Sequence, residues 1–571
     1  MIVAMVSPSI AQVKNTSRVK VEPVEPLHHL AVDQVEFEGF LGERMHDCIE
    51  HSVIEADVDN YVEQFETRTE HRWWQTEFWG KWMLSAAKAY EYASSEELIE
   101  IMEESVKGMI ATQTPDGYIG NYAPEHELKA WDVWGRKYTL LGLLYYYDLT
   151  GEGKALEAAK KLADYTMGQL GEGPNKERIV ITGNYRGMAS SSILEPIVLL
   201  YERTAEARYL EFANSIVEDW ETPQGPRLIS KALAEVPVSE RFTDYTRWWA
   251  WGNGQKAYEM MSCYDGLLRL YQLTGESQYL EAVEKTVANI IEDEINIAGS
   301  GASKECWFGG KHKQMYPAAH TMEVCATVYW MKLCYELHRL NHDAGLVDEI
   351  EKSAYNNLLG SLMPKGHRFA KYSALQGFRD PDGFQCNMHT NCCMANGPRG
   401  LTILQDLAVM KRGDGLVVNL YNPGNAKVEL SSGQTIEFAF DTRYPADGEI
   451  VVNVKSARPQ TFPMHLRVPG WSDGMSVQVN GTSTQVSGKS GAYLKLERQW
   501  ESGDEIRIEM GMPLKVHRLS DAHREFAAFT RGPITLAADS RHNKHGVDFE
   551  LYEIDSDLSF ELADDPGEAS Y

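Results

Sequence analysis

The sequence predicts a mainly α-helical domain with the architecture of an (α/α)6 barrel, followed by an all-β antiparallel sandwich domain. From about residue 41 to about residue 405, apolar residues recur with the helical period, in a unit that repeats at intervals of roughly 50 to 70 residues. Near Val417 the period changes to two, in short runs separated by turn residues. The length of 571 residues also favours two or more domains, because one hydrophobic core rarely serves so long a chain.

Residues 1–40 are predicted to form an extended lead-in with weak alternation of apolar and polar residues. The first twelve residues have a short apolar core and small residues but no basic leader, which is similar to the second half of a signal peptide. On that interpretation the protein is periplasmic or secreted. The alternative is an ordinary disordered tail on a cytoplasmic protein.

Residues 41–410 are predicted to form the helical domain. Its repeating unit is an apolar helix, a short turn and an acidic amphipathic helix. Thr150, Thr204 and Thr274 occupy three of these turns, and Thr just before an acidic first turn is an N-cap signature. About six such hairpins in about 360 residues favour a closed barrel over an open solenoid.

Residues 411–540 are predicted to form the sandwich. Seven short alternating runs are separated by Gly, Asp, Asn and Pro, at 416–421, 435–440, 449–454, 464–468, 476–481, 493–497 and 505–510. Because no helical pattern intervenes, these runs indicate antiparallel strands in two packed sheets. The remaining residues, 541–571, form an acidic and weakly patterned C-terminal segment.

The composition excludes two classes of partner. The chain has 55 Lys and Arg against 83 Asp and Glu, which gives a net charge of -28 and a field that repels nucleic acid and anionic lipid. No apolar run reaches the 18 or so residues that a membrane span needs. The 14 Trp and 28 Tyr either fill large helical cores or line sugar-binding clefts. The composition is compatible with a homodimer.

Two short cysteine motifs indicate a metal site. Glu323-Val-Cys325 and the adjacent pair Cys392-Cys393 together offer the four ligands that a tetrahedral Zn²⁺ requires. Adjacent cysteines rarely form a good disulfide, because the bridge favours Cα atoms that are farther apart. The alternative for Cys325 is core packing in an apolar helix, since free cysteine is often buried. Three further cysteines are interpreted as core: Cys48, Cys263 and Cys334.

The order of motifs resembles glycoside hydrolase family 127, whose founding activity is β-L-arabinofuranosidase. The motifs are Thr114-Pro-Asp-Gly-Tyr-Ile-Gly-Asn-Tyr122, Glu323-Val-Cys325, Cys392-Cys393-Met-Ala-Asn396, Thr442-Arg-Tyr-Pro-Ala-Asp-Gly448, Leu466-Arg-Val-Pro-Gly-Trp471, Val479-Asn-Gly481 and Arg531-Gly-Pro533. The resemblance covers roughly residues 40 to 540. It implies an exo-acting retaining glycoside hydrolase that releases a terminal sugar from plant or algal oligosaccharides.

The resemblance also implies roles for individual residues. Zn²⁺ is implied as the cofactor, with Glu323, Cys325, Cys392 and Cys393 as its ligands and Cys392 as the nucleophile. A zinc-bound thiol is deprotonated, which makes a thiolate available at neutral pH. Glu305, in a Gly-flanked loop, is implied as the acid/base residue; the alternative is a solvated loop glutamate.

The family's pattern of histidines around the sugar is absent from the matching positions. Those positions hold Trp131, Tyr138, Tyr258 and the serines 190–192. Aromatic rings stack on a sugar, whereas histidines form hydrogen bonds with its hydroxyls. The chain also resembles those members of the family that release 3,6-anhydro-D-galactose from the ends of carrageenan oligosaccharides, and this resemblance implies that sugar as the substrate, with β-L-arabinofuranose as the alternative. The substrate-binding candidates are Glu77, Trp79, Trp131, Tyr258, His320 and His389.

Some readings of the same residues place the protein in other classes. Two Trp-rich stretches, Trp73 to Trp79 and Trp248 to Trp251, are predicted to border the pocket, although each Trp could equally belong to the core. Helical toroids also host polysaccharide lyases and sugar epimerases, which use Tyr and His bases and need no thiolate. The third reading is a non-catalytic sugar-binding protein, because closed four-ligand zinc sites are usually structural.

Overall fold

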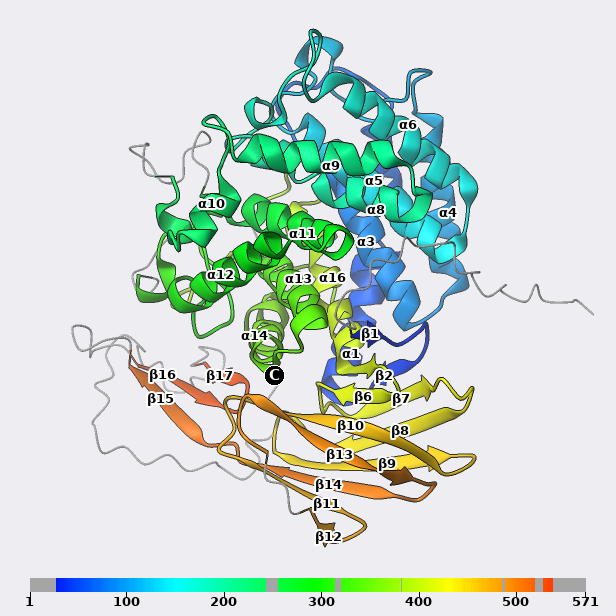
Figure 1. Ribbon diagram of the computed structural model, residues 1–571, viewed down its shortest axis with the longest axis vertical. Helices are drawn as coiled ribbons and strands as arrows, with labels where there is room; N and C mark the ends of the chain where they lie inside the picture. The colour runs from blue at the N-terminus through cyan, green and yellow to red at the C-terminus, as the bar shows by residue number, and fades with distance from the viewer. Residues whose placement is uncertain are drawn as a thin grey trace, which may run out of the picture.

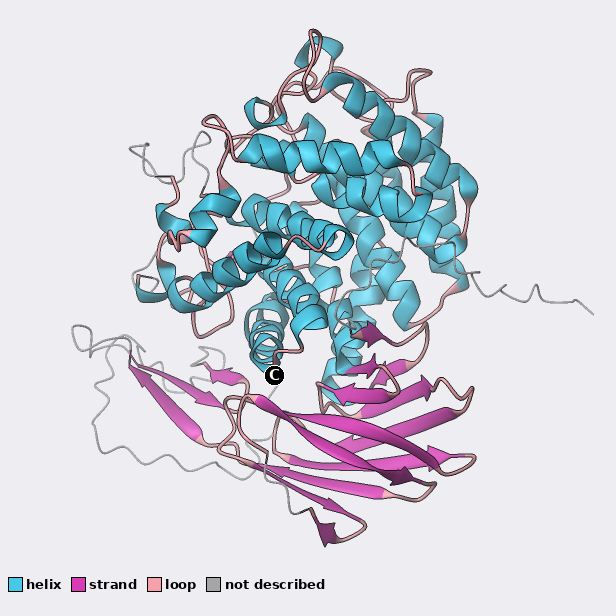
Figure 2. Ribbon diagram, viewed as in Figure 1, coloured by secondary structure: helices cyan, strands magenta, loops and turns pink. Residues whose placement is uncertain are grey.

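The computed structural model describes residues 27–242, 255–313, 320–380, 383–484, 488–518 and 527–537. The signal-like stretch at the N-terminus, the stretch from Trp248 to Trp251 and the acidic segment 541–571 lie outside the described residues. The chain folds into a helical region and a strand region that pack against each other (Figure 1, Figure 2). The predicted fold class is confirmed.

Six helices form a closed inner ring within the described ranges. They are α3 (Glu77–Tyr92), α5 (Asp132–Thr150), α8 (Leu194–Thr204), α11 (Ala257–Thr274), α13 (Val324–Asn341) and α16 (Cys392–Ala408). Each packs against the next, and α16 returns to α3, which closes the ring. The inner helices are buried on nearly all sides, which explains why their sequences are apolar around the whole helix.

An outer helix covers each inner helix. The outer helices are α4 (Glu96–Ala111), α6 (Gly153–Gln169), α9 (Ala207–Trp220), α12 (Ser277–Asp293) and α14 (Ala344–Lys352). Against α16, the sixth place is taken by α1 (Gly39–Cys48) and its π-helical continuation η1 (Ile49–Ile54). Shorter helices lie between them: α2 (Val58–Glu63), α7 (Met188–Ser191), α10 (Leu228–Leu233) and α15 (Leu359–Ser361).

The hairpin turns differ in detail from the prediction. Thr150, Thr204 and Thr274 are the last residues of inner helices rather than N-caps of outer ones. Each hydroxyl donates to the carbonyl four residues earlier and accepts from the backbone N–H two residues later. The N-caps are the glutamates that follow, such as Glu152, whose side chain accepts from the N–H of Lys154. The threonine thus ends one helix and leads the chain into the next.

The strands form a sandwich of two main sheets. The first has the order β1 (His28–His29), β5 (Val409–Arg412), β6 (Gly415–Val418), β10 (Gln460–Val468), β13 (Ala492–Trp500). The second has the order β12 (Thr482–Ser483), β11 (Met475–Val479), β14 (Glu505–Met510), β9 (Glu449–Ser456), β8 (Thr435–Thr442), β7 (Gly424–Glu429), β2 (Val35–Phe37). All these pairings are antiparallel except that of β6 with β10.

Two small sheets complete the described strands. β15 (Leu514–Arg518), β16 (Ala527–Arg531) and β17 (Ile534–Leu536) form one, and β3 (Tyr372–Ser373) pairs with β4 (Arg379–Asp380) in the other. The change from helix to strand lies between Ala408 and Val409, beside the predicted boundary at residue 410.

The described part of the lead-in belongs to the sandwich. β1 pairs with β5 in one sheet and β2 pairs with β7 in the other, so the blue strands lie beside yellow ones in Figure 1. Leu27, Val35 and Phe37 are buried, and this burial holds the segment in place.

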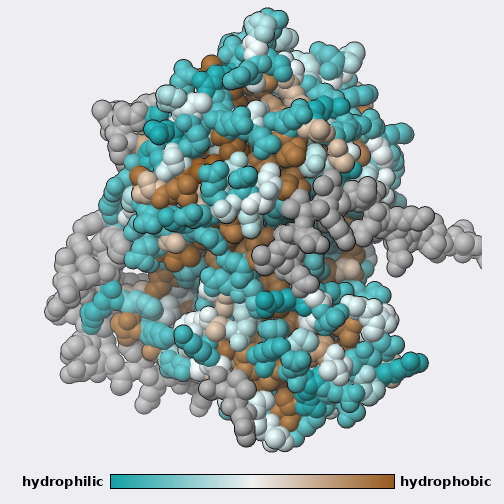
Figure 3. Space-filling view, viewed as in Figure 1, coloured by the Kyte–Doolittle hydropathy of each residue, from teal (hydrophilic) through white to brown (hydrophobic). Residues whose placement is uncertain are grey.

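None of the described helices is both long and apolar enough to cross a membrane. The face shown in Figure 3 is largely hydrophilic.

Candidate active site

The predicted metal ligands lie at the N-termini of two inner helices. Glu323 is the N-cap residue of α13, and Cys325 is the second residue of that helix. Cys392 and Cys393 are the first two residues of α16. The barrel packs α13 against α16, so residues separated by about seventy positions in the sequence meet at one end of the ring.

The four ligand atoms form a compact, buried cluster. They all lie within 4.8 Å of one another. Cys392 Sγ is 3.5 Å from Glu323 Oε1 and 3.9 Å from Cys393 Sγ, and Cys393 Sγ is 3.9 Å from Glu323 Oε1. Tetrahedral Zn²⁺ with bonds of about 2.0 to 2.3 Å separates its ligand atoms by about 3.5 to 3.8 Å. The chemistry and spacing of this donor set therefore fit a zinc ion.

The start of α16 is fixed by two side chains. Asn391 Oδ1 accepts hydrogen bonds from the N–H groups of Cys393 and Met394, at 3.0 and 3.1 Å. Gln385 Oε1 accepts from the N–H of Cys392, at 3.1 Å, and from Trp74 Nε1, at 3.3 Å. The cap orders the backbone that carries both thiols, and the positive ends of two helix dipoles favour negative charge in the cluster.

The cysteines of the cluster differ in pKa. Burial would raise the pKa of Cys325, but hydrogen bonds from Cys392 and Cys393 lower it to about 6. A hydrogen bond to the Cys325 sulfur and burial raise the pKa of Cys392 to about 11, although Cys393 and Lys371 oppose the shift. Burial also raises the pKa of Cys393. A thiolate at Cys392 thus requires further positive charge, which a divalent metal in this donor set would supply.

Glu305 lies in a polar niche made by three side chains from other elements. Lys256 forms a close ion pair with Glu305 Oε2, Lys371 Nζ lies 3.3 Å from Glu305 Oε1, and the Tyr372 hydroxyl donates to the same oxygen at 2.7 Å. The Glu305 side chain is 21% exposed, so solvent reaches it. Burial by itself would raise the pKa of this carboxyl, but Lys256 and Lys371 hold it below its usual range. The two lysines therefore favour the carboxylate form of Glu305.

The loop that presents Glu305 has an unusual backbone. Ala302, Lys304 and Glu305 all have positive φ, and so do His320 and Met322 on the segment beside them. Residues with side chains rarely adopt this conformation, and such strain gathers at functional sites. Hydrogen bonds hold the loop, including one from the Lys304 N–H to the His320 carbonyl and one from the Ala257 N–H to the Glu305 carbonyl.

Glu77 is buried on the first turn of α3, beside the cluster. It accepts a hydrogen bond from Lys81 Nζ at 2.9 Å and a short one from Trp134 Nε1. Burial raises its pKa, and Lys81 opposes the shift. Lys81 Nζ also lies 5.2 Å from the ring centre of Tyr138 and 4.8 Å from that of Tyr258. A buried cation is thus shared between a carboxylate and aromatic rings.

The other aromatic candidates differ in their exposed fractions and in the groups that they contact. Trp79 is fully buried and its ring packs against Gly142, which is a core position. Tyr258 is 3% exposed, and its hydroxyl is 2.5 Å from that of Tyr138. Trp131 is 5% exposed and packs edge-on against Trp134, with ring centres 5.7 Å apart. The serines 190–192 are also buried.

The two histidine candidates are exposed. The His320 ring stacks on that of Tyr372 at 4.7 Å, so it lies next to a residue that contacts Glu305. The His389 ring packs edge-on against Phe384 at 5.5 Å. No contact between His389 and the cysteine cluster is found in the described part of the chain.

Four polar neighbours of the site were not predicted from the sequence: Lys81, Lys256, Lys371 and Tyr372. Lys81 had a usable signal, because it is a lone charge in the apolar run from Phe78 to Leu84. The other three had none, since only the fold brings the start of α11 and β3 to the Glu305 loop.

Comparison with known proteins places these motifs in one family. Residues 32–406 match the model described as β-L-arabinofuranosidase, GH127 catalytic domain, and residues 415–512 match that of the GH127 middle domain. The chain is 24% identical over 511 residues to the non-reducing end β-L-arabinofuranosidase of Bifidobacterium longum subsp. longum, covering 81% of this chain and 75% of the relative.

Two solved structures share the fold. One is a GH127 β-arabinofuranosidase with a TM-score of 0.72 at 21% identity, covering 90% of this chain and 86% of the other. The second is a GH127 β-L-arabinofuranosidase from Geobacillus stearothermophilus T6, with a TM-score of 0.70 at 20% identity and coverage of 88% and 86%.

Proposed function

Because the chain belongs to glycoside hydrolase family 127 and is a glycoside hydrolase, we propose that it removes a terminal sugar by a retaining mechanism with Cys392 as nucleophile and Glu305 as acid/base. One observation carries the proposal. The Cys392 sulfur belongs to a buried cluster of one glutamate and three cysteines, held by two helix N-termini. Such a cluster activates a sulfur nucleophile, whereas a cysteine of the apolar core stays an inert thiol.

The proposed reaction has two displacements at the anomeric carbon. In the first, the Cys392 sulfur bonds to that carbon, the glycosidic C–O bond breaks, and the Glu305 carboxyl gives its proton to the leaving oxygen. In the second, the Glu305 carboxylate takes a proton from water, whose oxygen displaces the sulfur. Two inversions retain the configuration of the sugar.

The proposed metal site consists of Glu323, Cys325, Cys392 and Cys393. A Zn²⁺ bound there supplies positive charge that keeps the cysteines as thiolates. The contribution of the chain is to hold the Cys392 sulfur in one position, through the Asn391 cap and the Gln385 contact.

The first candidate substrate is a non-reducing terminal β-L-arabinofuranoside. The relative from Bifidobacterium and the two solved structures are described by that activity or by the closely worded β-arabinofuranosidase. The proposed pocket wall includes Trp131, beside the charged groups around Glu305: Lys256 Nζ is 5.8 Å from the centre of its ring.

The second candidate is a terminal 3,6-anhydro-D-galactose on carrageenan-type oligosaccharides. The observation that favours it is the pairing of the Tyr138 and Tyr258 hydroxyls with each other, beneath the aromatic wall. Hydroxyls that satisfy each other leave fewer hydrogen bonds for the hydroxyls of a sugar. A bicyclic anhydro sugar has fewer free hydroxyls and a larger apolar face, so it suits such a wall better.

Two isosteric variants test the proposed chemistry. Cys392→Ser and Glu305→Gln are each expected to lower kcat on the oligosaccharide by at least about 10³-fold while the protein stays folded, because each removes a group that bonds to or protonates the substrate. Activity is measured on arabinofuranosyl- and anhydrogalactosyl-terminated oligosaccharides, with the anomer of the released sugar followed by NMR. Full activity in Cys392→Ser would refute the proposal.

The metal-to-protein ratio is a separate readout of the cluster. One zinc per chain in the wild type and its loss in Cys393→Ala are expected, because the variant removes one of four ligands. A metal-free wild type that still hydrolyses glycosides would contradict the role of the metal. Release of an unsaturated product absorbing in the ultraviolet would indicate a lyase, and sugar binding without any product would indicate a binding protein.

A further inference from the structure

One buried ammonium group lies between two carboxylates beside the proposed acid/base residue. Lys256 is the N-cap residue of α11, and Glu259 lies three residues later on the same turn. The Lys256 ammonium pairs closely with Glu305 Oε2, and it is 3.9 Å from Glu259 Oε1. Lys256 is 7% exposed and Glu259 is 2% exposed, so the three groups interact with little screening by solvent.

Glu259 has no part in the reaction as proposed above. Its second oxygen, Oε2, is buried and has no hydrogen-bond partner among the described residues. A buried carboxylate oxygen without a partner is costly, so its presence calls for an explanation. Burial raises the pKa of Glu259 to about 7, although Lys256 opposes the shift. The Oε2 atom of Glu259 is therefore open to a nearby donor.

The acid/base role creates a need for such an acceptor. As a base, Glu305 is a carboxylate and pairs with Lys256, Lys371 and Tyr372. As an acid, Glu305 is neutral, and it can no longer balance the charge of the buried Lys256 ammonium. Leaving a buried charge without its partner typically costs about 3–5 kcal/mol. Without a second carboxylate, that cost would disfavour the protonated state that the first displacement requires.

We propose that Glu259 is a positioning residue that takes over the Lys256 ammonium whenever Glu305 carries its proton. The inference rests on the proposed function, since it presupposes the acid/base role of Glu305. The exchange of the ammonium itself changes no covalent bond: the ammonium leaves one carboxylate and pairs with the other, so it is never buried without a partner. Each Lys256 contact needs only a rotation of the flexible side chain, because both carboxylates lie within 4 Å of its nitrogen.

The groups around Lys256, Glu259 and Glu305 identify Glu259 as the carboxylate that takes over the Lys256 ammonium. Glu305 also faces Lys371, Tyr372 and Glu323. Glu259 faces Lys81 on α3, and both carboxylates influence Tyr185, on the loop before α7. Among the acidic groups that act on Lys256, Glu323 belongs to the proposed metal cluster, which leaves Glu259 as the carboxylate for this purpose.

The test is a comparison of two leaving groups in Glu259→Gln. The probes are the methyl and p-nitrophenyl glycosides of β-L-arabinofuranose, or of 3,6-anhydro-D-galactose if the wild type prefers that sugar. In the variant the Lys256 ammonium stays paired with Glu305. The carboxylate form of Glu305 is therefore favoured and its protonated form is scarce. Methanol leaves only with a proton, whereas p-nitrophenolate leaves without one. We expect kcat/KM to fall about 10- to 100-fold for the methyl glycoside and less than about twofold for the other.

The pH profile gives a second readout. The alkaline limb of kcat/KM for the methyl glycoside reports the loss of the Glu305 proton. Because the variant stabilises the carboxylate, that limb is expected to move to lower pH, by roughly one unit. Glu259→Asp keeps a carboxylate at the position and is expected to restore most of the wild-type limb. A purely structural role would lower the rates with both glycosides and leave the limb in place.

Glu336→Gln is the matched control. Glu336 is a buried glutamate that pairs with Arg269 and Arg339 near the far end of α13, so its loss affects stability without reaching Glu305. Equal losses on both glycosides and an unmoved limb in Glu259→Gln, as in the control, would overturn the inference. If the wild type hydrolyses no glycoside, or if Glu305→Gln still cleaves the methyl glycoside, the proposed function itself fails.

Discussion

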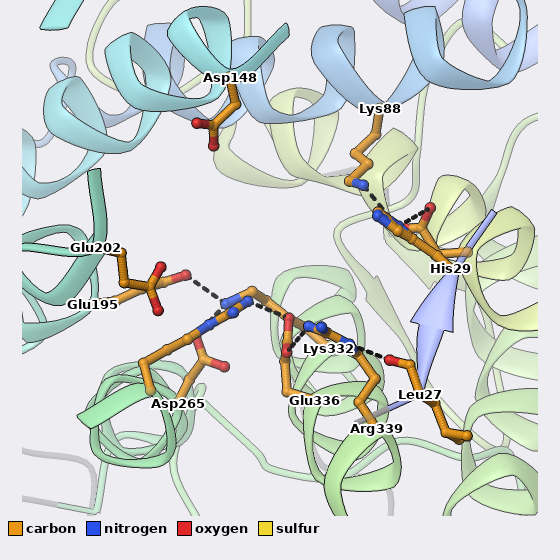
Figure 4. Close-up of polar contacts among 12 residues, drawn as sticks. Leu27, His29, Lys88, Asp148, Glu195, Glu202, Asp265, Lys332, Glu336 and Arg339 are labelled. Atoms are coloured by element: carbon orange, nitrogen blue, oxygen red, sulfur yellow. Dashed lines mark hydrogen bonds and ion pairs between the residues drawn. The ribbon is translucent and has the colours of Figure 1, made fainter. Parts of the chain in front are cut away.

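At the residue scale, the core of the barrel contains a second buried cation between two carboxylates. Lys332 Nζ lies 2.7 Å from Glu195 Oε1 and contacts Asp265 Oδ2 even more closely (Figure 4). The Tyr329 hydroxyl donates to both carboxylates, at 3.2 and 3.3 Å. All of these side chains are buried, so the attraction is strong but each charge depends on its partners.

Replacing this lysine should destabilise the barrel severely. Lys332→Met leaves Glu195 and Asp265 without the cation that pairs with both, and we expect a loss of about 3–5 kcal/mol in the free energy of unfolding. Urea unfolding of both proteins measures the loss. The triple variant Lys332→Met, Glu195→Gln, Asp265→Asn removes the three paired charges together and should recover most of the stability. A Lys332→Met protein as stable as the wild type would show that the ion cluster is not required.

The residues that the sequence predicted best are those whose chemistry is distinctive. A Glu-x-Cys motif and a Cys-Cys pair have few uses, so Cys325 and Cys392 stood out although their partners are about seventy residues apart. Lysines are common on surfaces, and nothing in the local sequence showed that Lys256 and Lys371 are buried beside Glu305. Such contacts depend on the closed ring of helices, which local patterns do not describe.

At the element scale, the first turn of α16 determines where two of the proposed ligands lie. Asn391 caps that helix with two hydrogen bonds to backbone N–H groups. The helix starts at Cys392 itself, so fraying of the first turn would displace both thiols. The cap thus links the stability of one helix end to the geometry of the cluster.

Asn391→Ala should therefore reduce stability and metal content together. Loss of the cap is expected to cost about 1 kcal/mol of unfolding free energy and to weaken zinc retention during dialysis against a chelator. Ser95→Ala is the control, because Ser95 caps the outer helix α4 through the N–H of Leu98. It should lose similar stability but keep its metal. Equal zinc retention in the two variants would argue against a role of the Asn391 cap at the site.

Helices and strands were predictable as elements because their apolar periods differ and persist over whole segments. The ends were less predictable. Thr150 was expected to start an outer helix but ends an inner one, because Gly151 takes the left-handed conformation that stops α5 and Glu152 caps α6. The few residues of β1 and β2 were too short to predict as strands, and only their pairing with β5 and β7 defines them.

At the scale of the whole molecule, the barrel and the sandwich share a tightly packed junction. His342, just after α13, stacks on Tyr493 of β13 with ring centres 4.1 Å apart. Arg467 of β10 pairs with Asp348 and Glu351 of α14, and its guanidinium is fully buried. The buried His338 ring also stacks on Tyr493, with ring centres 6.4 Å apart, so the junction buries both charge and imidazole and its stability depends on pH.

Acidification should weaken the molecule through His338, in the last turn of α13. Burial lowers the pKa of His338 to about 3, against about 6.5 in an unfolded chain. Between these values the unfolded state binds the extra proton, so stability falls as pH falls, by up to about 1.4 kcal/mol per pH unit. In His338→Gln the melting temperature should decline less steeply from pH 6.5 to 4.5 than in the wild type. His46→Gln, at an exposed histidine of α1, should keep the wild-type slope. Equal slopes in all three proteins would mean that the buried imidazole does not set the acid sensitivity of the junction.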